Sequence, residues 1–461
     1  MIRSLCLFYS LLYFSVALCQ PISLNQVNPH YFFYKTKPAV LITSGEHYGA
    51  VLNLDFNYRK YLAELKRKGL NLTRTFSGIY CEQPGAFNIA NNTLAPVSMK
   101  YLTPWARSDT PGYKNGGNKF DLTRWDDHYF KRLKDFVQTA ANNNIIVEFT
   151  LFCPFYEDNM WVLSPMHPSN NINATPHLQR TDVYTIDKNG SLLQIQQTLV
   201  RKLVIELNDY DNVIFEICNE PYFGGITMEW QHAIADVIHE TEKQLPKKHL
   251  ISQNIQNGSS LVTDPHPAVS VFNWHYAYPP VTVAMNYQLN KALGDNETGF
   301  RGISDSTYRF EGWRFIISGG ALFNHLDYSF APAHESGDYK YDTLQPGGGS
   351  DALRKQFGYL KNFIEGFDFI KMKPDTALIP KSNLRWNAIS ELSKQYAVYF
   401  IDDTLSAIDL PIPSGLYNVT WMHPASGKYQ KSVIVASKNN KLSLKIPPHK
   451  EDIALKIIKK P

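Results

Sequence analysis

Two glutamates stand at the ends of stretches that read as short buried strands. Residues 212–218 form an apolar run that stops at Asn219 and Glu220. Pro221 follows and prevents further strand pairing. Glu297 ends a second short strand, just before a turn marked by glycine. One such carboxylate alone is often only a solvated loop side chain, but a pair can do acid–base and nucleophilic chemistry when their environments separate their pKa values.

Residues 215–221 (Phe-Glu-Ile-Cys-Asn-Glu-Pro) resemble the acid/base motif of the clan A glycoside hydrolases, most nearly family 5, the cellulase-like enzymes. The order of strands and helices extends this resemblance over about residues 30–372. The resemblance implies that Glu220 is the acid/base at the end of strand four, and that Glu297 is the nucleophile at the end of strand seven. It also implies a double displacement that cleaves β-linked glycans and retains configuration.

Four further residues enter the predicted substrate site through the same resemblance. Arg74 lies in an apolar strand, where an unpaired charge is costly. Pairing with Glu297 would keep that carboxylate ionised, and a purely structural salt bridge is the alternative. Asn219 would hold the sugar 2-hydroxyl. The family's His-x-Tyr after strand six is replaced by adjacent His275 and Tyr276, so either residue could take the role beside the nucleophile.

The platform on which a sugar ring would stack is less clearly marked. A tryptophan often follows strand eight in the family, but residues 325–327 (His-Leu-Asp) stand there in this chain. Trp161, in the loop after strand three, could supply the platform or could be a packing residue. Glu148 and Glu216 also lie within strands, and we expect both to be paired polar groups inside the barrel.

Strand-like and helical stretches alternate up to about residue 372, which predicts an α/β fold, a closed parallel (β/α)8 TIM barrel. Residues 77–122 are expected to form one long loop. The expected strands are 38–45, 70–76, 145–151, 212–218, 249–254, 269–275, 291–297 and 321–327, and the expected helices are 55–68, 125–142, 192–207, 227–244, 306–317 and 351–371.

After about residue 373 the pattern changes to short alternating strands, which predicts a small antiparallel β-sandwich. Its expected strands are 396–401, 415–421, 431–436, 441–446 and 453–458. The expected domains are thus a signal peptide (1–19), a catalytic barrel (20–372) and an accessory β-sandwich (373–461). We expect the sandwich to brace the barrel, and a binding module is the alternative.

The N-terminus has the features of a secretory signal. Arg3 precedes an apolar run over residues 5–18, and Ala17-Leu18-Cys19 has the small-x-small form of a cleavage site. The mature protein is therefore expected to be secreted, extracellular or periplasmic. Lipidation at Cys19 is an alternative, although the preceding leucine is bulky for it.

Composition limits the partners that this chain can have. Its 461 residues are 44% hydrophobic and 19% charged, with a net charge of +4, as in ordinary globular proteins. No Lys/Arg run suggests nucleic-acid binding, and no stretch after the signal is long enough for an integral membrane segment. The expected partner is an oligo- or polysaccharide, and the expected state is a monomer. Aromatic residues, 13% of the chain, could serve as sugar platforms.

No cofactor is implied by the sequence. It has no Cys/His cluster with metal-ligand spacing and no Gly-x-Ser-x-Gly elbow. A glycine run before Ser350 lacks the lysine of a phosphate loop, so Ser350 is predicted to be a helix N-cap. After signal removal three cysteines remain, and Cys153 and Cys218 could pair or stay as thiols.

Two other functions compete with hydrolysis. The first is a catalytically silent carbohydrate-binding protein on the same barrel, and the second is an adhesive protein that acts through the β-sandwich. The presence of both carboxylates favours the enzyme, because a binding protein has no need of the pair.

Overall fold

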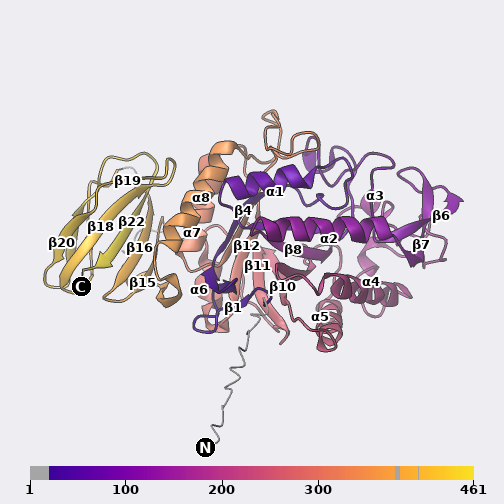
Figure 1. The fold of residues 1–461 in the computed structure, drawn as a ribbon, viewed down its shortest axis with the longest axis horizontal. Helices are drawn as coiled ribbons and strands as arrows, with labels where there is room; N and C mark the ends of the chain where they lie inside the picture. Colours follow the sequence, from indigo (N-terminus) through magenta and orange to yellow (C-terminus); the bar gives the residue numbers. More distant parts are fainter. Residues whose placement is uncertain (1–19, 379–384, 403, 461) are drawn as a thin grey trace, which may run out of the picture.

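The computed structural model describes residues 20–378, 385–402 and 404–460 (Figure 1). The predicted signal peptide, residues 1–19, lies outside the described residues, and so does the alternative lipidation site at Cys19. Cleavage and secretion therefore stay predictions. In the described part of the chain, no helix is long and apolar enough to cross a membrane.

Eight parallel strands form the barrel, in the spatial order β4-β13-β12-β11-β10-β9-β8-β5, and β5 lies next to β4 to bring the ends together. The predicted TIM barrel is confirmed, and each predicted strand overlaps an observed one. Their bounds are β4 (Leu41–Gly45), β5 (Leu72–Phe76), β8 (Ile146–Phe152), β9 (Val213–Cys218), β10 (Leu250–Asn257), β11 (Val269–His275), β12 (Ala292–Thr298) and β13 (Leu322–Leu326).

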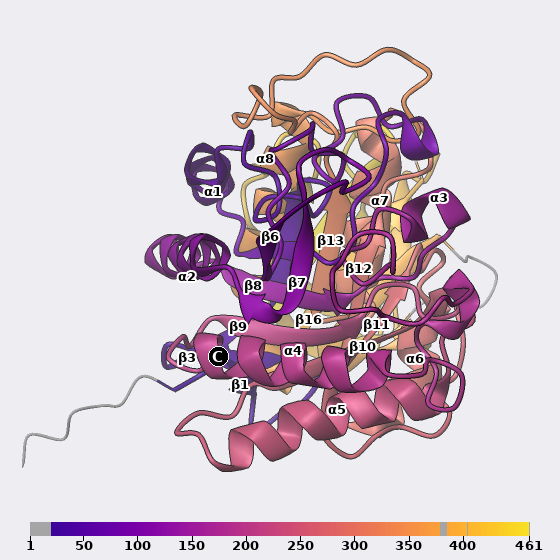
Figure 2. The ribbon, with the colours of Figure 1, turned by 90° about the vertical axis from the view of Figure 1, so that its right-hand side faces the viewer.

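Helices surround these strands (Figure 2). They begin where the sequence offers caps: Thr227 accepts from the backbone N–H of Trp230, and Ser350, the predicted N-cap, accepts from that of Leu353. The last barrel helix ends at Glu365, earlier than expected. The helices are α1 (Tyr58–Arg67), α2 (Asp127–Asn142), α3 (Asp158–Trp161), α4 (Leu192–Leu207), α5 (Met228–Lys243), α6 (Val281–Asn286), α7 (Asp305–Ile317) and α8 (Asp351–Glu365).

The stretch predicted to be one long loop contains an antiparallel hairpin, β6 (Trp105–Pro111) paired with β7 (Asn118–Trp125), so that prediction was wrong over this part. The hairpin strands, Trp-Ala-Arg-Ser-Asp-Thr-Pro and Asn-Lys-Phe-Asp-Leu-Thr-Arg-Trp, lack a clear apolar alternation, so the sequence carries no strand signal there. The guanidinium of Arg107 lies 4.0 Å from the ring centre of Phe120. A second small sheet, β1 (Ser23–Leu24), β2 (Phe32–Tyr34) and β3 (Lys37–Ala39), precedes the barrel.

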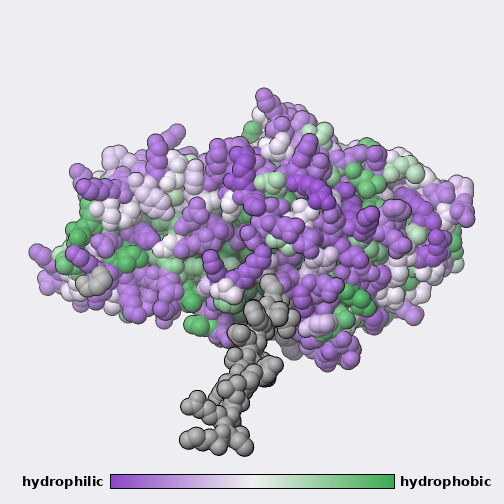
Figure 3. Space-filling view, in the orientation of Figure 1, coloured by the Kyte–Doolittle hydropathy of each residue, from purple (hydrophilic) through white to green (hydrophobic). Residues whose placement is uncertain are grey.

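The C-terminal residues form two antiparallel sheets that share one apolar core, as predicted. Four of their strands were not predicted, because three are only two to four residues long and the fourth is mixed in polarity: β14, β17 and β19 are the short ones, and β15 is the mixed one. The larger sheet contains β14 (Lys373–Pro374), β15 (Trp386–Glu391), β16 (Gln395–Ile401), β18 (Gly415–His423), β19 (Lys428–Tyr429), β20 (Val433–Ser437) and β22 (Asp452–Lys459), and the smaller β17 (Ala407–Leu410) and β21 (Leu442–Lys445). In Figure 3 the visible face is largely hydrophilic, with hydrophobic side chains gathered at the outer edge of these sheets.

The C-terminal sheets lie against α7 and α8 of the barrel (Figure 1). Trp313 of α7 stacks on Tyr399 with ring centres 5.2 Å apart. Arg309 of the same helix donates to Asp452 at 3.0 Å, and the hydroxyl of Tyr399 donates to the same carboxylate at 2.8 Å. This contact contains buried apolar and ionic groups, which is what a bracing domain requires.

Replacing Arg309 by Met is expected to lower the free energy of unfolding by about 3–5 kcal/mol, because Asp452 is left as a buried carboxylate without its cation. Chemical denaturation would measure the loss. Lys394→Met is the matched control: its ion pair with Glu391 is exposed on the lysine side, and its loss should cost under about 1 kcal/mol. Equal effects of the two changes would contradict a bracing role for the Arg309 pair.

Candidate active site

A pocket of about 430 Å³ opens where the barrel strands end at their carboxyl side. Its walls come from the loops or ends that follow β4, β5, β8, β9, β10, β11 and β12. This is the face on which TIM barrels place their chemistry. Of the residues predicted for the site, Asn219, Glu220, Tyr276 and Glu297 line this pocket directly.

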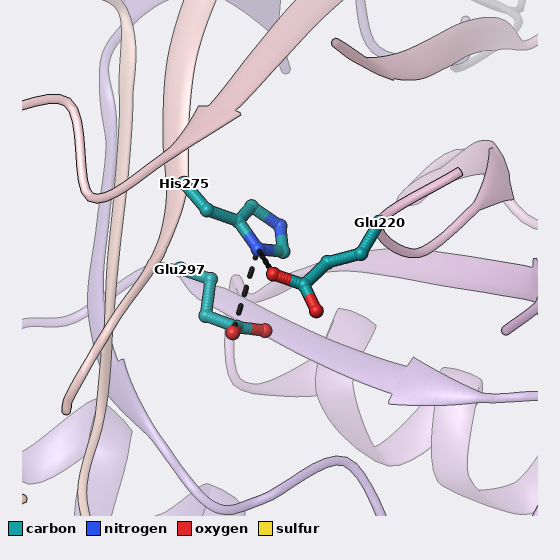
Figure 4. Close-up of side chains that lie close together, drawn as sticks. All are labelled: Glu220, His275 and Glu297. Atoms are coloured by element: carbon teal, nitrogen blue, oxygen red, sulfur yellow. Dashed lines mark hydrogen bonds and ion pairs between the residues drawn. The ribbon is translucent and has the colours of Figure 1, made fainter. Parts of the chain in front are cut away.

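The two predicted carboxylates face each other here, with His275 between them (Figure 4). One oxygen of Glu220, one of Glu297 and one ring nitrogen of His275 all lie within 4.8 Å of one another. Nδ1 of His275 is 3.0 Å from Oε1 of Glu220 and 3.4 Å from Oε1 of Glu297. Glu220 has a left-handed backbone with φ of 37°, an unfavourable conformation for glutamate that occurs where β9 gives way to Pro221.

Glu297 is surrounded by groups that favour its charged form. The hydroxyls of Tyr48 and Tyr276 donate to its two oxygens at 2.8 and 2.7 Å, and Nη1 of Arg74 lies 3.3 Å away. Burial alone would raise the pKa of Glu297, but His275, Arg74 and the Tyr276 hydrogen bond outweigh it, and the pKa is lowered. Glu297 is therefore held as a carboxylate.

Glu220 has a different set of partners. The hydroxyl of Tyr156 donates to its Oε2 at 2.5 Å, and that of Tyr222 donates to its Oε1 at 3.1 Å. The side-chain amide of Asn219 donates to the Tyr156 oxygen at 2.9 Å. Unlike Glu297, Glu220 has no arginine among these partners. The pair thus meets the requirement that two carboxyl groups have unlike environments.

His275 and Tyr276 both reach the carboxylates, so the alternatives left by the sequence are not exclusive. Tyr276 contacts Glu297, while His275 contacts both glutamates. Burial alone would lower the pKa of His275, but the charge of Glu297 and the bonds to both carboxylates raise it to about 10. His275 is therefore an imidazolium at neutral pH, and its positive charge lies between the two carboxyl groups.

Arg74 connects this site to the interior of the barrel. Its Nε donates to Glu216 at 2.8 Å and its Nη2 donates to Asn219 at 2.6 Å, in addition to the contact with Glu297. Arg74 thus combines the two roles between which the sequence could not choose. Glu216 also accepts from Thr150 and from the side-chain amide of Asn296.

Glu148 lies deeper in the same network and accepts from Ser252, Asn273 and Asn296. Burial, and then the charge of Glu216, raise the pKa of Glu148 to about 7. Both strand glutamates are thus paired inside the barrel, as predicted. Asn296 belongs to a glycosylation sequon but is fully buried here, so a glycan on it is incompatible with this packing.

Trp161 does not contribute to the pocket wall. Its side chain is 3% exposed, its ring lies 4.9 Å from that of Phe155, and its Nε1 donates to the carbonyl of Leu178. Of the two roles considered from the sequence, platform and packing, this geometry is that of packing. The apolar wall instead includes Phe87, Phe223 and Phe300.

Three tyrosines of the site, Tyr48, Tyr156 and Tyr222, were not predicted from the sequence. They lie in loops after three different strands, and no spacing relates them. The three cysteines of the described chain, Cys81, Cys153 and Cys218, are buried free thiols, and Cys153 lines the pocket.

The triad Glu220, His275 and Glu297 also has the spacing of a metal site. The arrangement fits a cation poorly, because Arg74 is beside Glu297 and the imidazolium of His275 occupies the space between the carboxylates. Tyrosine hydroxyls already donate to both carboxylates. These donors and charges suit an acid–base pair better than a ligand set.

Replacing Arg74 by Met should raise the pKa of Glu297, because one of the charges that stabilise the carboxylate is lost. The stability that this ionised group contributes exists above the usual carboxyl range and is lost as the pH falls, so in the variant the loss should begin at higher pH. Carboxyl ¹³C shifts of glutamate-labelled protein would measure the pKa. Arg67→Met, which removes an exposed cation on α1, is the control. An unchanged Glu297 titration in the Arg74 variant would refute this assignment.

Comparisons with known proteins agree with this arrangement. The model of the family "Cellulase (glycosyl hydrolase family 5)" matches residues 90–297, a segment that contains Glu220 and ends at Glu297. No curated protein matches the chain. A candidate glycoside hydrolase of Bacteroides vulgatus ATCC 8482 superposes with a TM-score of 0.69 at 14% identity, covering 96% of this chain and 83% of its own.

Two further structures are similar in fold. A family 5 glycoside hydrolase of the same bacterium gives a TM-score of 0.63 at 14% identity, with 95% of this chain and 93% of its own covered. A variant of a family 5 mannosidase from Rhizomucor miehei gives 0.52 at 11% identity, with 75% and 99% covered. The resemblance suggested by the Asn-Glu-Pro motif is confirmed: the chain has the fold of the family 5 glycoside hydrolases.

Proposed function

We propose that this chain is a secreted, retaining glycoside hydrolase that acts on β-linked glycosides. The observation that carries the proposal is the buried carboxylate pair, whose nearest oxygens lie within 4.8 Å and whose partners differ. Retaining enzymes hold their carboxyl groups about 5–5.5 Å apart, whereas inverting enzymes leave about 6.5–9.5 Å for a water molecule. The short separation therefore supports the retaining mechanism. Secretion rests on the N-terminal sequence alone.

In the first step, an oxygen of Glu297 attacks the anomeric carbon as the bond from that carbon to the leaving oxygen breaks. Glu220 gives its proton to the leaving oxygen. The lowered pKa of Glu297 supports its role as nucleophile, since it is charged before the substrate arrives. In the second step Glu220 takes a proton from water, which attacks the same carbon and releases the sugar with its β configuration.

The neighbouring side chains have supporting roles in this proposal. Tyr48, Tyr276 and Arg74 fix the carboxylate of Glu297 and favour its charge. Asn219, held by Arg74 and Tyr156, is placed beside Glu220 at the pocket wall, where it would bind the 2-hydroxyl. No step requires a cofactor.

A panel of 4-nitrophenyl β-glycosides and β-linked polysaccharides would test the activity. β-Mannosides belong in the panel because one structural relative is a mannosidase. Hydrolysis of at least one β-glycoside is the expected result. Binding of a glycan without release of product would instead favour the carbohydrate-binding alternative.

Glu220→Ala should slow substrates with poor leaving groups by roughly 10²–10⁴-fold, and activated aryl glycosides far less, because only the former need protonation. Azide should partly restore turnover and give a β-glycosyl azide, since the small anion can enter the space left by the side chain. Steady-state rates and product analysis measure both effects. An equal fall for both substrate kinds, without azide rescue, would show that Glu220 is not the acid/base.

A 2-deoxy-2-fluoro β-glycoside with a good leaving group should trap a covalent adduct on Glu297, because fluorine slows the second step more than the first. Peptide mapping by mass spectrometry would locate the label. A label on another carboxylate would show that this other residue, and not Glu297, is the nucleophile. Release of an α product from ordinary substrate, seen by NMR, would refute the two-step mechanism.

A further inference from the structure

Five aromatic side chains form a continuous belt around the mouth of the pocket, which we call the aromatic collar. Neighbouring ring centres along it are 5.8, 5.3, 6.4 and 6.4 Å apart, mostly in edge-to-face contact. All five line the pocket, and they come from the loops or ends after five barrel strands. In order they are Phe223, Tyr156, Phe87, Phe300 and Tyr276.

The collar lies toward solvent and the carboxylates lie beneath it. Phe223 and Phe300 are 43% and 37% exposed, large values for phenylalanine beside a pocket, whereas Glu220 and Glu297 are buried. Asn257, at the end of β10 between β9 and β11, also lines the pocket and accepts a hydrogen bond from the Tyr222 hydroxyl. Rings thus make up much of the wall near the pocket mouth.

Polar groups at the collar are already engaged within the protein. The hydroxyls of Tyr156 and Tyr276 are directed to the two catalytic carboxylates. The guanidinium of Arg301 pairs with Glu311 and lies 4.9 Å from the ring centre of Tyr278. The collar therefore presents mainly carbon to whatever occupies the mouth.

The floor of the pocket has the opposite character. His47 lines it with both ring nitrogens buried, and its Nε2 forms an ion pair with Glu82 at 3.6 Å, while its Nδ1 has no hydrogen-bond partner among the described residues. A buried polar atom without a partner is costly, so a ligand that supplies a hydroxyl would satisfy the Nδ1 of His47. A sugar ring carries several hydroxyls and matches these polar groups, whereas an alkyl or aryl group matches the mainly apolar collar.

We infer that the substrate is a glycoside whose aglycone, the group released on cleavage, is apolar: an aryl or alkyl group seated in the aromatic collar. This inference rests on the proposed function. The sugar ring occupies the floor near His47, and the apolar group passes through the mouth. The pocket volume, near the lower end of the range for small-molecule sites, suits such a short glycoside better than the interior of a polysaccharide chain.

The test compares glycosides that share a sugar and differ in the aglycone: methyl, octyl and a second sugar residue, each as the β-glucoside, β-galactoside and β-mannoside. The octyl glycoside should have the highest kcat/KM. Phe223→Ala and Phe300→Ala should each lower the octyl-to-methyl ratio of kcat/KM roughly tenfold, because the alkyl chain loses its apolar contact. Phe33→Ala is the matched control, a ring 38% exposed in β2, outside the pocket lining.

A readout other than turnover separates this inference from the proposed activity. Octyl glycosides should bind the Glu297→Gln protein more tightly than methyl glycosides in calorimetry, with a negative heat-capacity change that Phe223→Ala diminishes. Tight octyl binding without hydrolysis in the unmutated protein would refute the proposed activity and support the collar site. An octyl-to-methyl ratio that both phenylalanine changes leave intact, or a faster reaction with the sugar aglycone, would overturn the inference.

Discussion

The site depends on the contacts that the buried guanidinium of Arg74 makes with three neighbouring side chains. It lies in β5 with essentially no exposure and contacts Glu216 below, Asn219 at the side and Glu297 above. A buried arginine is tolerated only when its charge and donors are matched, and here each partner is itself fixed by a strand. Because one side chain joins β5, β9 and β12, the two strands that lead to Glu220 and Glu297 are held together at their carboxyl ends.

This dependence explains why the polar interior of the barrel is so extensive. Glu148 and Glu216 are two carboxylates close together, and Arg74 neutralises only part of their charge. The side-chain amide of Asn296 donates hydrogen bonds to both glutamates. Ser252 and Asn273 donate further hydrogen bonds to Glu148. Asn296 directly precedes Glu297 in the chain. The position of Glu297 is therefore set on one side by the arginine and on the other by its own neighbour in the chain.

The sequence was sufficient for the barrel and for the residues that lie in or directly after its strands. Short runs rich in apolar residues, such as residues 269–275, mark buried parallel strands, and the observed β11 has those bounds. Strand ends in a parallel barrel meet at one face, whatever their separation in the chain. For this reason the sequence could assign four residues to that face: Glu220, Glu297, Arg74 and Asn219.

The sequence was not sufficient where the chain leaves the strands. The hairpin of β6 and β7 has no periodic apolar pattern, and the tyrosines that contact the carboxylates come from loops whose paths depend on tertiary packing. Trp161 illustrates the same limit. Its position in a loop after strand three allowed a role at the pocket, but the path of that loop turns the ring behind Phe155. A sequence motif can therefore predict where a side chain lies when that side chain is in a strand or directly after it. It cannot do so for a side chain farther along a loop.

In the proposed cycle, the positive charge of His275 can be balanced first by Glu297 and then by Glu220. His275 carries its proton chiefly because the charged carboxylate of Glu297 faces it, and the charge of Glu297 is the largest influence that raises its pKa. When Glu297 becomes an ester, that charge is gone, and the imidazolium is left facing Glu220 alone. Glu220 has given up its proton at the same moment, so its new negative charge is the one that His275 then balances. The net charge of the three groups is unchanged between the resting state and the covalent intermediate, and a buried site can pass between them without drawing an ion from solvent.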